Sequence, residues 1–255
     1  MTLLQTLETY YDSAPRPSAT AEEVGPFTLF LRTDPTGWPY YARPRLGVEH
    51  DFTAADVSTL RARQRELDVP ENIEWVHETT PSLLDAAREA GLIVHECPLL
   101  VLPEGGVSSS PPVPAGTRVV MLSSDSRELG AATSAVHAGF AGTDELTDRD
   151  PTRQAHLLRE GLTSLAGAFD AHGAAGGGTH SPRGATTELT GIAVLPRARK
   201  QGVGAAITHA LVTDARDRGV ETVFLSAQDD TVARVYERVG FVRVGTACIA
   251  EVPDA

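Results

Sequence analysis

The sequence of 255 residues is poor in cysteine and has no long apolar run. Cys97 and Cys248 lie far apart and form no CxxC or Cys/His pattern, which argues against a disulfide scaffold or a zinc ribbon and favours a reducing cytoplasm. No run of eighteen apolar residues occurs, so no membrane-spanning helix is expected. Residues 1–16 carry acidic side chains and no basic cluster before an apolar stretch, so we do not expect a secretory signal.

Basic side chains are also scarce. The chain has 22 Lys and Arg against 34 Asp and Glu, a formal net charge of -12, and Lys200 is its only lysine. Because phosphate contacts require surplus Lys and Arg, this charge argues against a nucleic-acid partner. An acidic surface attracts cationic amines, although net charge does not select one of them. We interpret the lack of lysine, and of asparagine other than Asn72, as codon bias in a GC-rich genome.

The net negative charge is concentrated in the first part of the chain. Residues 1–105 carry 8 basic and 17 acidic side chains, and residues 106–255 carry 14 and 17. Between them runs GGVSSSPPVPAG, whose prolines and lack of apolar periodicity indicate a linker. We therefore predict a domain over 1–104, a linker over 105–116 and a second domain over 117–255.

Strand and helix signals alternate in both domains. The first helix signal is a capping pattern, Thr53 followed by Asp56. In the first domain we expect strands over 27–32, 72–77 and 92–102, and helices over 54–67 and 81–90. In the second we expect strands over 118–122, 166–171, 174–180, 187–195, 220–225 and 241–252, and helices over 127–141, 152–166, 203–218 and 230–239. A glycine-rich turn is expected within 172–185.

The segment RKQGVG, from Arg199 to Gly204, lies between an apolar strand and an amphipathic helix. Glycines before a helix let the backbone approach a ligand, and the free N–H groups of the first turn then favour an anion such as pyrophosphate. Ala205 and Ala206 exclude the Walker pattern, and Ile207 stands where the dinucleotide fingerprint needs a glycine. On its own the segment is equally consistent with a tight turn between strand and helix.

A second motif, VARVYERVGF, follows over residues 232–241, and its Tyr236 lies thirty-two residues after Gly204. With it the sequence resembles the GNAT superfamily of acetyl-CoA-dependent N-acetyltransferases, most clearly over 187–245 and acceptably from 117 onward. The matching pattern is an R/Q-x-x-G-x-G/A loop, a helix, a strand and a later helix with alanine, tyrosine and a closing Gly-Phe. The residues that carry it are Arg199, Gly202, Gly204, Ala233, Tyr236, Gly240 and Phe241.

The resemblance implies an α/β chain of the α+β type, with a mixed, mostly antiparallel central sheet flanked by helices. It implies transfer of an acetyl group from acetyl-CoA to a primary amine of a small molecule or peptide, by direct attack in a ternary complex and with no metal. The strand residues Ile192, Ala193 and Val194 would pair with the pantetheine arm. The pyrophosphate would be held at Arg199, Lys200, Gln201, Gly202, Val203, Gly204 and Ala205.

The resemblance also assigns chemistry to two side chains. Tyr236 would lie near the thioester sulfur and protonate the leaving thiolate, and it would contact the coenzyme. Glu188 would deprotonate the acceptor amine, since a protonated amine cannot attack a thioester. A packed aromatic and a strand-edge carboxylate are the alternative interpretations of these two residues. His180, expected in a loop, is a rival base. Asp230 replaces the family's asparagine near the coenzyme, and an ionised carboxylate cannot donate a hydrogen bond there.

The first domain contains a weaker copy of the later motif. AAREAGLIV aligns with VYERVGFVR when Gly91 is matched to Gly240, which suggests a degenerate GNAT-like half and a tandem arrangement. Ala87 then stands in place of Tyr236, and no glycine loop precedes the helix over 54–67, so we expect no chemistry in this half. An unrelated α/β cap is the alternative. For the whole chain, the alternative to an enzyme is an acyl-CoA-binding regulatory module without turnover, and Tyr236 favours the enzyme.

Overall fold

The computed structural model describes residues 2–35, 37, 39–106 and 111–253, and it divides the chain into two compact units. The first unit comprises Met1–Leu100, Ser226–Ala233 and Arg243–Ala255, and the second comprises Val101–Leu225 and Arg234–Val242. Part of the expected linker, residues 107–110, lies outside the described residues. Two segments from the end of the chain belong to the first unit, so the division into continuous domains stays a prediction.

The first unit is built from the first half of the chain and its last strand. Its elements are α1 (Leu3–Ser13), β1 (Ala19–Val24), β2 (Phe27–Arg32), β3 (Ala42–Pro44), α2 (Ala54–Glu66), β4 (Ile73–Val76), α3 (Ser82–Glu89), β5 (Ile93–Leu102) and β11 (Val242–Glu251). The strands follow the order β1-β2-β3-β4-β11-β5. Residues of α2 and α3 pack with Phe27, Ile73 and Trp75 in one apolar core.

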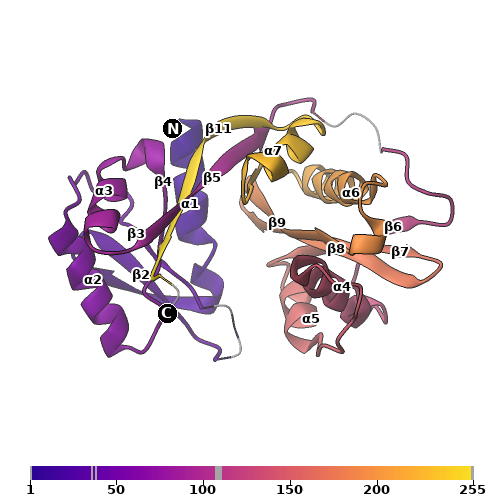
Figure 1. Cartoon of the computed structure of the whole chain (residues 1–255), viewed down its shortest axis with the longest axis horizontal. Helices are drawn as coiled ribbons and strands as arrows, with labels where there is room; N and C mark the ends of the chain where they lie inside the picture. Colours follow the sequence, from indigo (N-terminus) through magenta and orange to yellow (C-terminus); the bar gives the residue numbers. More distant parts are fainter. Residues whose placement is uncertain (1, 36, 38, 107–110, 254–255) are drawn as a thin grey trace. The chain divides into compact units, whose positions relative to one another are not determined.

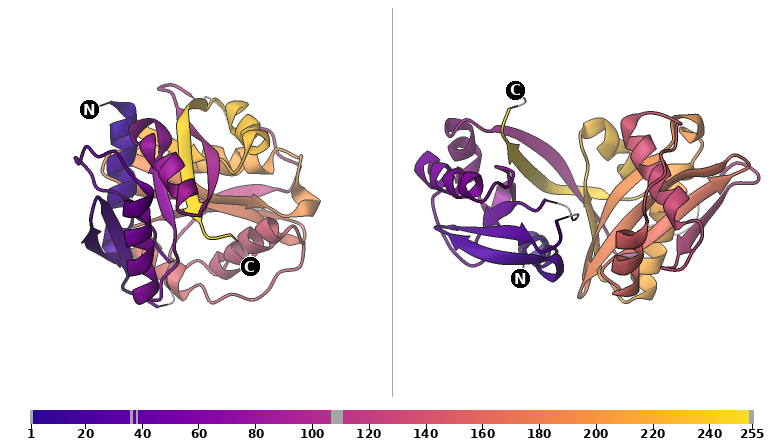
Figure 2. Two further views of the ribbon diagram at one scale, coloured as in Figure 1. Left: turned by 60° about the vertical axis from the view of Figure 1, so that its left-hand side comes forward. Right: turned by 90° about the horizontal axis from the view of Figure 1, so that it is seen from below.

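Strand β11 completes this sheet, although it comes from the far end of the sequence. It is antiparallel to β4, with Cys248 opposite Trp75. In both views of Figure 2 the yellow strand runs beside β5, its other neighbour in the strand order. The expected strand over 241–252 is confirmed, but its place beside β4 was not predicted, because a local pattern does not reveal which partner a strand will pair with.

Helix α1 was missed altogether. Its N-cap Thr2 accepts a hydrogen bond from the Gln5 backbone N–H, and the Gln5 side chain accepts one from the Thr2 N–H. This capping box is a recognisable sequence signal for a helix start. Its buried side chains include Leu7, Tyr10 and Tyr11, together with the acidic Glu8.

The second half of the chain supplies ten elements. They are β6 (Arg118–Leu122), α4 (Leu129–Ala141), α5 (Thr152–Arg159), β7 (Ser164–Asp170), β8 (Gly173–Arg183), β9 (Thr186–Val194), the 3₁₀ turn η3 (Pro196–Ala198), α6 (Val203–Asp217), β10 (Thr222–Ser226) and α7 (Asp230–Glu237). The strand order is β10-β9-β8-β7-β6. Figure 1 shows α6 on one face of this sheet and α4 with α5 on the other.

The expected antiparallel strands over 166–171 and 174–180 are confirmed as β7 and β8, but β8 continues to Arg183, so most of segment 172–185 is strand and not the expected turn. Its glycines face helices on both sides of the sheet. A Cβ on Gly177 would lie 3.1 Å from Val136 of α4, and one on Gly178 would lie 3.2 Å from Ile207 of α6. Because both helices pack directly on the strand backbone, glycine is required here by close approach rather than by a turn.

Helix α5 ends at Arg159, before the expected end at residue 166. Its C-terminal turn closes on Gly161, which has a φ of 68°, and β7 starts at Ser164. The apolar residues after Gly161 belong to strand β7, whose residues 164–169 are all buried, and not to helix α5.

Among the described residues, no helix is long and apolar enough to cross a membrane.

Candidate functional site

Strands β9 and β10 run parallel for only a short distance. Their register pairs Thr186 with Thr222 and Glu188 with Phe224, and within the described chain the ladder ends there. On its other edge β9 stays paired with β8 as far as Val194, opposite Gly176. The backbone beyond Glu188 is therefore paired with a strand on one edge only, which leaves an edge where an extended ligand could bind.

The loop after β9 ends in an unusual helix start. Gly202 is the N-cap of α6 with a φ of 81°, and Lys200 before it has a φ of 60°. The α6 N-cap has no side-chain hydrogen bond, and the first turn carries no acidic residue. The first N–H groups of the helix thus keep their capacity to bind an anion in the positive field of the helix end.

The two glycines of the loop are needed for different reasons. A Cβ on Gly202 would lie 2.5 Å from the Pro112 carbonyl oxygen, and its φ is one that side chains rarely adopt. Gly202 is therefore required by its own φ and by the close approach of the Pro112 backbone from the expected linker. A Cβ on Gly204 would lie 3.6 Å from Val194 Cγ2, an ordinary contact distance. The protein alone would accept a small side chain at this second position.

Arg197 and Arg199 both donate hydrogen bonds to backbone carbonyls, although Arg199 itself is exposed. Arg199 donates from Nε to the Val194 carbonyl at 3.0 Å and from Nη2 to the Gly139 carbonyl at 2.6 Å. Arg197 forms an ion pair with Asp170 and donates to the Ala174 carbonyl at 2.8 Å. Lys200 is also exposed, and its charge can reach a phosphate bound at the loop.

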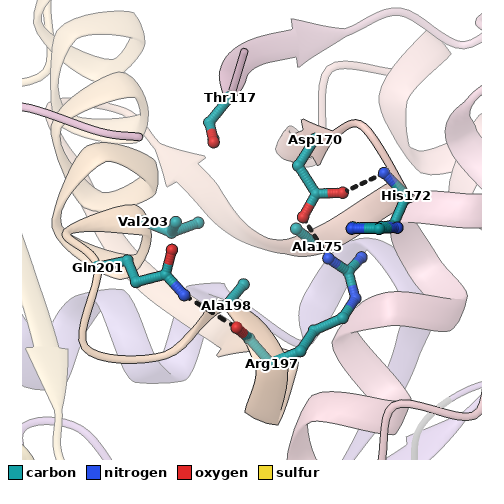
Figure 3. Close-up of a pocket in the computed structure, with 8 residues that line it drawn as sticks. All are labelled: Thr117, Asp170, His172, Ala175, Arg197, Ala198, Gln201 and Val203. Carbon is teal, nitrogen blue, oxygen red and sulfur yellow. Dashed lines mark hydrogen bonds and ion pairs between the residues drawn. The ribbon is translucent and has the colours of Figure 1, made fainter. Parts of the chain in front are cut away.

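A pocket of about 260 Å³ lies beside the loop (Figure 3). Its lining comes from β6–β8 and from the start of α6: Thr117, Asp170, His172, Ala175, Arg197, Ala198, Gln201 and Val203. Gln201 Nε2 donates to the Arg197 carbonyl at 2.9 Å, and Asp170 accepts from the His172 N–H at 2.7 Å. Burial alone would raise the pKa of Asp170, but hydrogen bonds from Arg197 and His172 outweigh it and lower that pKa. These polar groups hold the loop in place.

Tyr236 lies on α7, the helix that follows β10. Its ring makes an edge contact with Phe241 at 6.0 Å between centroids. Burial raises the pKa of Tyr236 to about 12, so the phenol stays protonated at physiological pH. At the start of the same helix, Asp229 Oδ1 accepts from the Val232 N–H at 2.8 Å. Asp229 is thus the cap, whereas Asp230 pairs with Arg243 at 2.9 Å.

The two candidate bases are placed very differently. Glu188 is the last β9 residue in register with β10, at the point where the two strands begin to separate. His180 does not lie in a loop, as expected, but in β8 with its side chain fully buried. Its Nε2 lies 2.8 Å from Asp214 Oδ2 and its Nδ1 lies 3.1 Å from Thr187 Oγ1. A buried histidine with both nitrogens engaged is a core residue, so the loop placement was wrong.

The structure thus brings Val194, Arg199 and Gly204 together at the end of β9. The coenzyme contacts of these and the neighbouring residues stay predictions, as do the roles of Tyr236, Glu188 and Asp230. Sequence reasoning missed the hydrogen bonds of Arg197 and Arg199, because their acceptors are backbone carbonyls that carry no sequence signature.

Comparison with known proteins gives a family for the second half. Residues 127–241 match the model of the acetyltransferase (GNAT) family. No curated protein shows significant similarity to the chain.

Solved structures extend the fold likeness to the whole chain. A GCN5-related N-acetyltransferase from Kribbella flavida matches with a TM-score of 0.79 and 20% identity, over 100% of this chain and 97% of that one. A tandem GNAT protein from the clavulanic acid biosynthesis pathway matches with a TM-score of 0.58 and 16% identity, over 94% and 85%. A GCN5-related N-acetyltransferase-like protein from Streptococcus suis matches with a TM-score of 0.60 and 11% identity, over 97% of each chain.

At these identities the structures show the fold and not the activity. They confirm the expected mixed, mostly antiparallel sheet flanked by helices and the GNAT-like first half. The family match thus identifies a GNAT acetyltransferase domain at residues 127–241, and the solved structures show the fold of tandem GNAT proteins over the length of the chain.

Proposed function

We propose that this protein is an N-acetyltransferase that transfers the acetyl group of acetyl-CoA to a primary amine of a small molecule or peptide. The GNAT family implies acetyl-CoA-dependent acetyl transfer. The amine acceptor and the direct attack in a ternary complex are our inference. A cytoplasmic location belongs to the same proposal, and the two free, buried cysteines support it.

One observation supports the coenzyme site above all others. The β9–β10 ladder ends at Glu188 and Phe224, and the free edge of β9 leads directly to a helix start with no side-chain cap. In the proposed complex, the backbone of Ile192, Ala193 and Val194 pairs with the pantetheine arm. The amides of the loop from Arg199 to Ala205 receive the pyrophosphate, with charge from Lys200.

In the proposed reaction, Glu188 removes a proton from the acceptor amine, directly or through water. The free amine then attacks the thioester carbonyl, and the carbon–sulfur bond breaks as the tetrahedral intermediate collapses. Tyr236 donates its hydroxyl proton toward the sulfur as negative charge develops there, and the proton that the attacking nitrogen then loses restores the phenol. The position of Glu188 at the opening between the strands supports this assignment.

The environment of Tyr236 refines that role. Its pKa of about 12 lies above the pKa of about 8.5 of an ordinary thiol, so it is a weak acid toward a free thiolate. We therefore expect its hydrogen bond to matter most while the sulfur is still leaving. We also expect activity to show no loss from Tyr236 ionisation below about pH 11, one unit under that pKa.

The test is release of free thiol from acetyl-CoA in the presence of mixed primary amines. Amine-dependent release, with an acetylated amine identified by mass spectrometry, is the expected result. Coenzyme A binding by calorimetry without any thiol release would instead indicate the regulatory binding module. Absence of both binding and release would remove the proposal.

A further inference from the structure

Arg199 occupies the position where the family pattern suggests a positive charge for the coenzyme. Its guanidinium is instead held by two backbone carbonyls, Val194 at the end of β9 and Gly139 on the last turn of α4. Two of its nitrogens, Nε and Nη2, are therefore engaged by the protein itself. Arg199 thus connects three elements: the loop, the strand β9 and the helix α4.

Arg199 contacts α4 at the C-terminus of the helix, which is the negative end of the helix dipole. Gly139 contributes one of the last carbonyls of that helix, which ends at Gly142 with a φ of 70°. A cation at a helix C-terminus is favoured by the helix dipole, and the Gly139 carbonyl accepts from Arg199 in addition to the Gly142 N–H. The same turn packs on the β9 backbone, since a Cβ on Gly139 would lie 3.2 Å from the Val194 nitrogen.

A second contact joins the loop to the segment after α4. The Arg197 N–H donates to Asp144 Oδ1 at 3.1 Å. Asp144 lies in the connection 142–151 between α4 and α5, which is acidic and largely exposed. Both ends of the link are therefore fixed: Arg199 holds the last turn of α4, and Asp144 holds the chain that follows it.

We propose that Arg199 is a positioning residue that fixes the last turn of α4 and the connection 142–151 for acceptor binding, and is not a ligand of the coenzyme phosphates. The proposal rests on the acetyltransferase function for its kinetic consequence. In the proposed complex, the loop amides and Lys200 bind the diphosphate. Arg199 couples the position of the loop to the position of the last turn of α4. A bidentate guanidinium suits this task, because it holds two carbonyls in one plane.

The first measurement is hydrogen exchange of the whole protein, without any substrate. Arg199→Gln should raise amide exchange in residues 139–146 by about tenfold or more, which corresponds to losing a charge-assisted hydrogen bond. Exchange in β9 and in the interior of α6 should stay unchanged. Arg199→Lys should restore part of the protection, since an ammonium can reach one carbonyl but not both. Unchanged exchange in 139–146 would overturn the link.

The second measurement separates the acceptor from the coenzyme. With Arg199→Gln, the Kd of coenzyme A measured by calorimetry should change by less than about threefold, whereas the acceptor KM should rise by about tenfold. The acceptor is the amine with the fastest thiol release in the screen above. Lys200→Gln is the contrast: it should weaken coenzyme A binding and reduce its salt dependence.

The outcomes distinguish this proposal from the proposed function. A coenzyme A Kd weakened by more than about tenfold in Arg199→Gln, with exchange unchanged, would identify Arg199 as a phosphate ligand and overturn the proposal. If the wild-type protein binds no coenzyme A, the proposed function fails, whereas the exchange experiment still decides whether Arg199 holds the end of α4.

Discussion

The two halves of the chain contain equivalent pairs of parallel strands, β3–β4 and β9–β10, and they differ in what occupies the separating edge. In the first half the pairing reduces to Ala42 with Ile73. Beyond it, Glu8 of α1 accepts from the Val76 N–H at 3.0 Å and forms an ion pair with Arg43, whose side chain is fully buried. The edge that is open beyond Glu188 in the second half is thus filled by side chains in the first.

The helices that follow β3 and β9, which are α2 and α6, also differ: the start of one is capped and the start of the other is not. At the start of α2, the Thr53 side chain accepts from the Asp56 N–H, and the Asp56 carboxylate accepts from the Thr53 N–H at 2.9 Å. This helix satisfies its first amides and neutralises its positive end with its own residues. Helix α6 begins at Gly202 without such a cap.

A fold can therefore keep its strands and helices while local side chains fill a strand edge and cap a helix start. The residue aligned with the proposed acid, Tyr236, also differs between the two halves. Ala87 stands in place of Tyr236 and is fully buried in the core of the first unit. We infer that the first half has lost its ligand site by internal substitution, and that the second half retains one.

Loss of the Tyr236 hydroxyl should have the largest effect. Tyr236→Phe preserves the ring contact with Phe241 and removes the proton donor. Because positioned proton transfer contributes about 10²–10⁴-fold, kcat should fall by that range while the Kd of coenzyme A stays constant. Steady-state thiol release and calorimetry check it. Wild-type turnover in this variant would remove the assigned difference between the halves at this position.

Breaking the ion pair of the first half should cost stability. Glu8→Ala leaves Arg43 buried without its partner, so the free energy of unfolding should fall by about 3–5 kcal/mol, as for other broken buried pairs. Urea unfolding measures this loss. At pH 5, where the buried Glu74 near Arg43 is protonated, the double variant Glu8→Leu with Arg43→Met should be closer to wild type, since neither charge of the pair is left buried alone. An equal loss in both variants would show that the pair is not what stabilises this edge.

Giving α6 the cap of α2 should abolish the difference between the helix starts. Ala205 occupies the third position of α6, as Asp56 does in α2, and it is only partly buried. Ala205→Asp places a carboxylate at the proposed phosphate site, so coenzyme A binding should weaken by about tenfold or more. Ala205→Asn, of the same size without the charge, should bind nearly normally. Equal affinities in calorimetry would contradict an anion site at this helix start.

Opposite pH dependences should distinguish the two units. Burial raises the pKa of Glu74 to about 7, so its contribution to the free energy of unfolding is complete below its ordinary pKa of 4.5 and is lost as pH rises toward 7. Burial lowers the pKa of His180 despite Asp214, so its contribution is complete above 6.5 and is lost as pH falls below it.

These contributions are measured against matched variants. Relative to wild type, Glu74→Gln should stabilise β4 at pH 8 more than at pH 5, and His180→Gln should reduce the loss of β8 stability on acidification. Amide exchange at both pH values, corrected for intrinsic rates, checks this. A shift of the same sign in both units would contradict the assigned pKa directions.

Local patterns predicted much of the fold. The strands over 27–32 and 118–122 and the start of α6 at Val203 are confirmed, because alternation, periodicity and a glycine cap are short-range signals. The order of motifs also predicted the family. What failed depends on partners distant in the chain. The glycines of β8 are explained only by α4 and α6, and His180 only by Asp214.

The candidate site shows the same limit. The uncapped helix start follows from the glycine loop, which the sequence displays directly. The contact of Arg199 with Gly139, sixty residues away, and that of Glu8 with Val76, sixty-eight residues away, do not. A backbone carbonyl or amide is present at every position, so no residue type indicates which one a side chain will reach.

Titration of the whole protein with coenzyme A by calorimetry tests the central claim most directly. The account predicts one site per chain, weakened in Ala205→Asp and retained in the double variant Glu8→Leu with Arg43→Met. Two equivalent sites per chain, or one site whose affinity is unchanged by Ala205→Asp, would contradict it, because a ligand would then bind in the half whose strand edge and helix start are already filled.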